Sequence, residues 1–215
     1  MPLKLYFLFL LVFLFPVDHM EQRNWELKVN KDGIKIYMRP SADSPVKELK
    51  VECTLQASLT QVVAVLLDVN ATGEWVYETK SATLLKKVSP SELYYYSEVN
   101  VPWPASNRDF VAHIKVKQDP HTKIVTIDAP NTPDMVPRKE DVVRITQATG
   151  KWILVPAGEK LVKVEYYLQV DPGGSLPAWL VNMFATKGPH ESFKKLKKQV
   201  KSPVYSKSHL PFIVD

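Results

Sequence analysis

Residues Asp171–Asn182 read Asp-Pro-Gly-Gly-Ser-Leu-Pro-Ala-Trp-Leu-Val-Asn and decide how the chain is organised. The preceding segment, Val162–Val170, alternates apolar and polar residues, which predicts a half-buried β-strand. Pro172 and the two glycines end it, because proline cannot donate to a strand ladder and glycine opens positive-φ turns. Ser175 is then predicted to cap a helix with Pro177 in its first turn. A long strand therefore turns sharply and sends a helix back across a sheet, an arrangement that can enclose an apolar cavity.

The predicted helix runs from Leu176 to about Lys201. Gly188-Pro189 should bend or interrupt it, because proline removes a backbone hydrogen bond and clashes with the preceding turn. Apolar stripes lie on both sides of that bend, with Leu176, Leu180, Met183 and Phe184 before it and Phe193, Leu196 and Val200 after it.

The rest of the chain is rich in strand signals around one early helix. Trp25–Val29 and Ile34–Arg39 flank a predicted hairpin turn, and Val46–Gln56 alternates strictly. Ser58 to Gln61 forms a capping-box pattern before Leu59–Leu67 at helical spacing, and a short helical or irregular piece is expected through Asn70–Tyr77. Six strands are expected after it, at about 80–88, 92–101, 107–118, 122–129, 140–155 and 160–170. This order predicts an α+β fold with one antiparallel sheet.

The N-terminus has the composition of a targeting segment and not that of a folded domain. Lys4 precedes an apolar run, Leu5–Phe15, which is too short to span a bilayer comfortably and fits the core of a signal peptide. No Ala-x-Ala cleavage pattern follows, so residues 1–22 are interpreted as a signal peptide or an uncleaved anchor. Export to the periplasm or the outside is expected. The lone Cys53 offers no disulfide and is interpreted as a small core residue.

The 215-residue chain carries a net charge of +5, and much of the excess sits late, in Lys187, Lys194, Lys195, Lys197, Lys198, Lys201 and Lys207. A basic terminal helix can attract anionic lipid or nucleic acid, whereas the simpler interpretation is a solvated helix face. Nucleic acid is the weakest hypothesis, because aromatic residues are not interleaved with these lysines as base stacking requires.

Three motifs, in order along the chain, resemble the START (steroidogenic-acute-regulatory-related lipid transfer) domain family. They are Trp25 with Gly33-Ile34-x-Ile36-Tyr37, then Asn107-Arg108-Asp109-Phe110-Val111, then Asp171-Pro172-x-Gly174-x-x-Pro177-x-Trp179-x-x-Asn182. The resemblance spans residues 23–203 and leaves 204–215 as a C-terminal tail. It implies the helix-grip fold, in which a curved antiparallel sheet and the C-terminal helix enclose a tunnel for one lipid. Family members bind sterols, phospholipids, ceramides or related apolar molecules.

The inward faces inferred for the strands and the last helix fit such a tunnel, which needs varied apolar side chains and few polar groups. The alternative for each residue is that it only fills a core. Methionine suits a site that adapts to a flexible ligand. The candidate ligand-binding residues are Tyr95, Val99, Trp103, Phe110, Ile114, Tyr166, Leu168, Leu180, Met183 and Phe184.

Two polar features qualify the resemblance. Arg108 and Phe110 lie two residues apart, so their side chains are expected on the same face of the strand. The family resemblance places this arginine in a structural polar network, and a structural role is therefore expected. Sterol-binding members can carry an acid and a base on two neighbouring tunnel strands. The matching positions here are Tyr95 and Ile114, so the pair is missing and no sterol preference is transferred, although Tyr95 can still donate a hydrogen bond.

The loop Val101–Ser106 holds Trp103 between two prolines, at the position of the family's mobile lid. Tryptophan favours the membrane interface, and the prolines stiffen the loop that presents it. The sequence therefore favours a lid or a transient membrane contact over a tryptophan packed on the end of the barrel.

The sequence contains no recognisable catalytic, metal-binding or phosphate-cradling motif. Asp109 and His113 share the outward face of one strand and are interpreted as surface residues rather than a catalytic dyad. The first hypothesis is a monomeric lipid-binding or lipid-transfer protein without a cofactor. The alternative is an enzyme of the broader superfamily, a cyclase or hydrolase of aromatic or polyketide compounds, with Tyr94, Tyr95, Tyr96 or His113 in its cavity.

Overall fold

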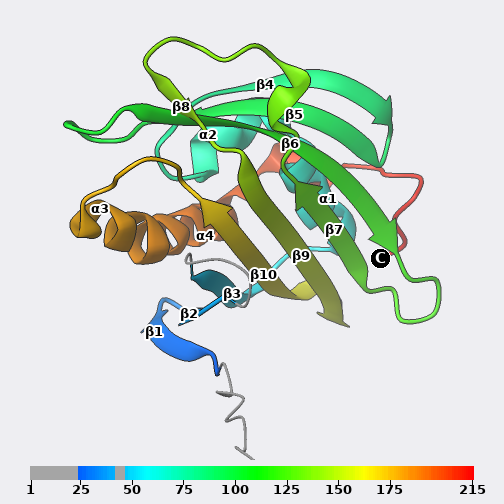
Figure 1. Ribbon diagram of the computed structural model, residues 1–215. Helices are drawn as coiled ribbons and strands as arrows, with labels where there is room; N and C mark the ends of the chain where they lie inside the picture. Colours follow the sequence, from blue (N-terminus) through cyan, green and yellow to red (C-terminus); the bar gives the residue numbers. More distant parts are fainter. Residues whose placement is uncertain (1–23, 42–46) are drawn as a thin grey trace, which may run out of the picture.

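The computed structural model describes residues 24–41 and 47–215. Its main feature is one strongly curved sheet in the order β1-β2-β3-β10-β9-β7-β6-β5-β4, with β8 paired to β6, and the C-terminal helix lies across it (Figure 1). Among the described strands all pairings are antiparallel except that of β6 with β8, so the predicted α+β class with one antiparallel sheet is confirmed. The strands are β1 (Glu26–Lys31), β2 (Ile34–Arg39), β3 (Glu48–Leu55), β4 (Thr79–Ser89), β5 (Glu92–Val99), β6 (Asn107–Gln118), β7 (Val125–Pro130), β8 (Val142–Arg144), β9 (Gln147–Gly158) and β10 (Leu161–Asp171).

The early elements follow the sequence pattern closely. β1 and β2 form the predicted hairpin, and its turn residues Asp32 and Gly33 both have positive φ, 56° and 65°. Helix α1 (Leu59–Leu67) begins at the predicted capping box, in which the Ser58 side chain accepts from the Gln61 backbone and the Gln61 side chain accepts from the Ser58 backbone. The expected short helical piece consists of η1 (Val69–Ala71) and α2 (Thr72–Trp75).

The C-terminal helix starts later than expected. Pro177 is its N-cap, and α3 (Ala178–Asn182) has no side-chain cap, so the predicted start at Leu176 and the cap by Ser175 are wrong. The physical reason is Pro177 itself, because the residue before a proline is held out of the helical region and Leu176 therefore stays extended. The turn before it uses Gly173 and Gly174 at positive φ, 66° and 62°.

The predicted interruption of this helix is present as a change of helix type. A π-helical turn, η3 (Met183–Lys187), separates α3 from α4 (Gly188–Gln199), which has Pro189 in its first turn. The i→i+5 turn accommodates a proline that has no amide hydrogen for the regular ladder. A short helix, α5 (Pro203–Ser206), follows, and a 3-10 turn, η2 (Pro133–Met135), lies between β7 and β8.

The single strand expected at 140–155 is wrong, since two strands occupy it. β8 pairs in parallel with β6 through Asn107↔Val142, whereas β9 pairs antiparallel with β7 and β10. Ile145 and Thr146 lie between them, and the Ile145 amide donates to the Asp109 carbonyl at 2.9 Å. The chain must leave one partner strand to join another, so the ladder cannot run through.

The core lies between the concave face of the sheet and the helices α1 and α4. Phe193 of α4 packs on Trp152 of β9 with the ring centroids 5.4 Å apart, and Cys53 is buried as predicted. The described residues contain no helix long and apolar enough to cross a membrane. The predicted leader, residues 1–22, falls outside the described residues, and its role stays a prediction.

Candidate ligand-binding site

The strand register places the predicted ligand-binding residues of the strands on one face of the sheet. Tyr95 of β5 lies opposite Ala112 of β6, and Val99 lies opposite Arg108. On the other side of the sheet Tyr166 of β10 lies opposite Trp152 of β9, and the next inward residue, Leu168, lies opposite Gly150. This face is the one that α4 covers, because Phe193 contacts both Trp152 and Tyr166.

Aromatic rings form two groups on this face. Tyr95 and Phe110 meet edge to face with their centroids 5.9 Å apart, which is a favourable geometry for aromatic pairs. Tyr166 is held more tightly, with its ring centroid 4.3 Å from that of Trp152 and 5.9 Å from that of Phe193. Packing on several sides fixes the direction in which the Tyr166 hydroxyl points.

The predicted residues differ in how completely they are packed. Ile114 and Leu180 are buried, and Ile114 belongs to the main hydrophobic cluster. Tyr95, Val99, Phe110, Tyr166 and Leu168 are only partly buried although they face the interior of the grip. Met183 and Phe184 of η3 are also half-buried, and the Phe184 ring meets the Tyr77 ring edge to face at 6.2 Å.

The two inward tyrosines have strongly desolvated hydroxyls. Burial raises the pKa of Tyr95 to about 12, and burial together with the neighbouring Tyr95 raises the pKa of Tyr166. Partly accessible rings that carry desolvated hydroxyls are typical of side chains that line an interior space. Both phenols are neutral at physiological pH and therefore available as hydrogen-bond donors and acceptors.

Arg108 joins the start of β6 to the strand–helix junction. Its guanidinium donates to the backbone carbonyls of Ser106 at 2.5 Å, Gly173 at 3.2 Å and Pro172 at 3.4 Å. Carbonyl oxygens thus satisfy a buried cation, as buried charges require. The β5–β6 loop and the Pro172–Gly173 turn are therefore fastened to the same side chain.

Two tryptophans are exposed, one in the β5–β6 loop and one in the helix that follows the Pro172–Gly173 turn. Trp103, in the β5–β6 loop, is 89% exposed, and Trp179, in α3, is 52% exposed. Trp103 therefore does not pack on the end of the barrel. The β5–β6 loop and α3 both lie on the left-hand side of Figure 1.

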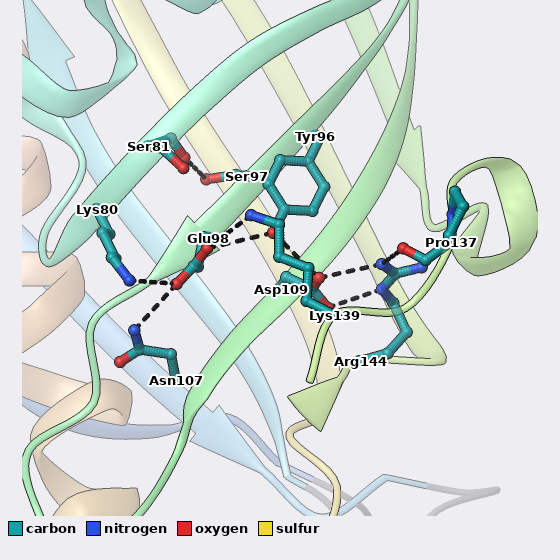
Figure 2. A network of polar contacts seen from close by, with 10 residues as sticks. All are labelled: Lys80, Ser81, Tyr96, Ser97, Glu98, Asn107, Asp109, Pro137, Lys139 and Arg144. Atoms are coloured by element: carbon teal, nitrogen blue, oxygen red, sulfur yellow. Dashed lines mark hydrogen bonds and ion pairs between the residues drawn. The ribbon is translucent and has the colours of Figure 1, made fainter. Parts of the chain in front are cut away.

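The outer face of β5 and β6 carries a buried polar network that the sequence did not indicate (Figure 2). Arg144 of β8 binds both carboxylate oxygens of Asp109, at 2.7 Å and 3.0 Å, and Tyr96 donates to Asp109 at 3.1 Å. Asp109 is 0% exposed, so its prediction as a surface residue is wrong. Its side chain does point outward, but the segment from Pro133 to Arg144 covers it, because Arg144 also donates to the carbonyls of Pro133, Val136 and Pro137.

Glu98 forms the second half of this outer network. It accepts from Lys80 at 2.7 Å, Lys139 at 2.9 Å and Asn107 at 3.0 Å, and these contacts lower its pKa to about 2. Since Lys139 lies in the covering segment, Glu98 fastens that segment to the sheet alongside Asp109.

His113 does not form a dyad with Asp109. Its Nε2 lies 2.6 Å from the Glu92 carboxylate, and its ring stacks on Tyr94 with the centroids 3.9 Å apart. All these contacts are on the outer face, away from Tyr95. Among the described residues no group of three His, Cys, Asp or Glu side chains is arranged to hold a metal ion.

Two hollows lie elsewhere on the described part of the molecule and include none of the predicted ligand-binding residues. One, of about 320 Å³, is lined by residues of β7, β9 and β10 such as Thr149 and Gln169. The other, of about 210 Å³, lies between α1 and the β4–β5 hairpin, against Leu210.

Sequence reasoning missed the contribution of β9 to the concave face. Gly150, Trp152 and Leu154 are buried, in alternation with exposed or half-buried neighbours. That alternation was the available signal, but treating 140–155 as one strand hid it. With β9 included, the concave face is continuous from β10 to β5.

Comparison with known proteins agrees with this geometry. The START domain family model matches residues 19–205. A crystal structure of a StAR-related lipid transfer protein from Xanthomonas axonopodis is 35% identical and covers 83% of this chain and 99% of its own, with a TM-score of 0.75. The phosphatidylcholine transfer protein of Mus musculus is 30% identical over 180 residues, which are 81% of this chain and 83% of that protein. An aromatase/cyclase from Streptomyces, at 12% identity and a TM-score of 0.51, covering 73% of this chain and 94% of its own, shares the fold alone. The curved sheet closed by a C-terminal helix and the matched family model together show that this chain belongs to the START domain family.

Proposed function

We propose that the protein binds one hydrophobic, lipid-like ligand between the concave face of the sheet and the C-terminal helix, and transfers it between membranes. The observation that carries the proposal is the set of inward but only partly buried side chains on β5, β6 and β10, namely Tyr95, Val99, Phe110, Tyr166 and Leu168. Family membership supports a lipid-binding role, and the similar proteins from Mus musculus and Xanthomonas axonopodis are lipid transfer proteins.

Burial of ligand surface is sufficient to hold such a molecule. At roughly 25 cal/mol per Å² of apolar surface, a few hundred Å² supply several kcal/mol before the entropy cost of binding is subtracted. Passive binding of this kind needs no catalytic group, which agrees with a concave face built mainly from apolar and aromatic side chains.

Entry and exit of the ligand use the elements that Arg108 joins. Trp103 and Trp179 are exposed at that end, and tryptophan partitions to the interface between lipid headgroups and acyl chains. Contact of these residues with a membrane would loosen the β5–β6 loop and α3 together. In this proposal the protein is exported and acts as a monomer, and its N-terminal apolar run serves as a signal peptide or an anchor.

Transfer of a pyrene-labelled lipid between vesicles tests the proposal. Trp103→Ala and Trp179→Ala are each expected to slow transfer, and Met183→Trp is expected to reduce uptake by filling the interior. Val204→Ala is the matched control, because Val204 is 76% exposed but lies on α5. Transfer by the wild-type protein that is no faster than spontaneous exchange would contradict the proposal.

A further inference from the structure

The two inward tyrosines have hydroxyls without a hydrogen-bond partner. Among the residues that the structure describes, neither the Tyr95 nor the Tyr166 hydroxyl has a hydrogen bond, although the outward Tyr96 has two acceptors. Neither hydroxyl is among the fully buried side-chain atoms that lack a partner, so each hydroxyl opens onto a space. Two hydroxyls on one interior face therefore have their hydrogen-bonding capacity free for water or for a bound molecule.

The part of the concave sheet surface between these tyrosines, here called the floor, carries very small residues. Ala112, Ala129 and Gly150 lie on three successive strands, β6, β7 and β9, between β5 and β10. The Tyr166 hydroxyl lies 3.6 Å from the position that a Cβ on Gly150 would take, so it points over this floor. These small residues extend least from the sheet, and Tyr95 lies close enough to Tyr166 to raise its pKa.

No charged side chain of the described residues shifts the pKa of either tyrosine. Burial alone shifts the pKa of Tyr95, and only burial and Tyr95 shift that of Tyr166, so no acid or base contributes. The nearest inward cation on β6, Arg108, is bound by three carbonyls and lies four residues from Ala112, about 13 Å along the strand. A phosphate or carboxylate buried here would lack a counter-charge, which is costly.

The three unpaired groups in this cluster can all donate a hydrogen bond. The indole nitrogen of Trp75 is also buried without a partner, and its ring centroid lies 6.3 Å from that of Trp152, which packs on Tyr166. An indole N–H can only donate, and a phenol can donate. The complementary group is therefore an acceptor oxygen without charge.

We propose that the Tyr95 and Tyr166 hydroxyls together bind an uncharged oxygen-bearing group, a hydroxyl or an ester or amide carbonyl, at the buried end of the ligand. The protein would thus select neutral lipids, of the diacylglycerol type, over phospholipids with the same acyl chains. This inference rests on the proposed lipid-binding function and specifies its ligand class.

The test uses three pyrene-labelled lipids with identical acyl chains, a diacylglycerol, a phosphatidylcholine and a phosphatidic acid, in a vesicle-to-vesicle transfer assay with the full chain. Faster transfer of diacylglycerol than of both phospholipids is expected. Tyr95→Phe and Tyr166→Phe should each lower diacylglycerol transfer about two- to tenfold, the loss of one hydrogen bond. Tyr94→Phe is the control, because this change removes the same atom on the outer face, where Tyr94 stacks on His113.

The melting temperature separates binding from folding. Neither hydroxyl has a partner within the protein, so both phenylalanine variants should melt no lower than the wild type. Phosphatidylcholine transfer equal to diacylglycerol transfer, or diacylglycerol transfer unchanged in the double variant, would overturn the neutral-lipid site while leaving lipid transfer intact. Transfer of none of the three lipids would overturn the proposed function and this site together.

Discussion

Replacing Asp109 by asparagine should destabilise the protein strongly, because this change removes the negative half of a buried ion pair. The Asp109 side chain is 0% exposed and that of Arg144 is 1% exposed, and the two are joined by a two-pronged contact at 2.7 Å and 3.0 Å. Removal of one partner leaves an uncompensated charge, which typically costs about 3–5 kcal/mol. For a domain of this size each kcal/mol lowers the melting temperature by about 2–4 °C, so a decrease of about 6–20 °C is expected.

A double-mutant cycle makes this prediction specific. Asp109→Leu combined with Arg144→Met removes both charges and should recover most of the loss, because buried ion pairs can be replaced by apolar residues with little net cost. The free energy of unfolding is measured by urea denaturation, with Glu26→Gln as control, since Glu26 pairs with Lys28 on the surface. An Asp109→Asn variant within about 0.5 kcal/mol of the wild type would refute the reasoning, because this is the range of ordinary surface substitutions.

Three further predictions concern the helix, the junction and the outer network. Leu180→Ala should cost about 2–5 kcal/mol in urea denaturation, because Leu180 is fully buried, and a smaller loss would show that α3 packs loosely. Arg108→Met should increase cleavage within 171–182 in limited proteolysis, because Gly173 loses its anchor, and an unchanged cleavage pattern would refute this. Lys80, Lys139 and Asn107 lower the pKa of Glu98 from 4.5 to about 2, so its stabilisation is complete above pH 4.5 and is lost as the pH falls through 2. Allowing for the half-exposed lysines, that contribution is about 1–3 kcal/mol, and Glu98→Gln should flatten the acid limb of the stability curve.

Local patterns were sufficient to predict most of the fold. The alternation of Val162–Val170 predicted β10, and the capping box at Ser58 predicted the first residue of α1. The motifs at Asn107–Val111 and Asp171–Asn182 predicted two segments that Arg108 joins in space. These features depend on neighbours along the chain or on motifs specific to the family.

Long-range pairing explains what the sequence did not predict. The break between β8 and β9 follows from a change of partner strand, which leaves no mark in the composition of 140–155. Asp109 has an outward parity, but its burial depends on Arg144, 35 residues away. The concave face was incomplete because 140–155 was treated as one strand, which hid the alternation of Gly150 and Trp152, and the structure places both residues through pairing with β7 and β10.

The most direct test of the central claim is native mass spectrometry of the protein purified from a lipid-rich host. The account predicts one lipid per wild-type chain and none on Gly150→Phe, because a side chain there would begin 3.4 Å from the Ala129 Cβ and 3.6 Å from the Tyr166 hydroxyl and fill the floor. Lys151→Phe, on the exposed face of the same strand, should keep the lipid. A wild-type chain without lipid, or a Gly150→Phe chain that retains it in full, would contradict the account.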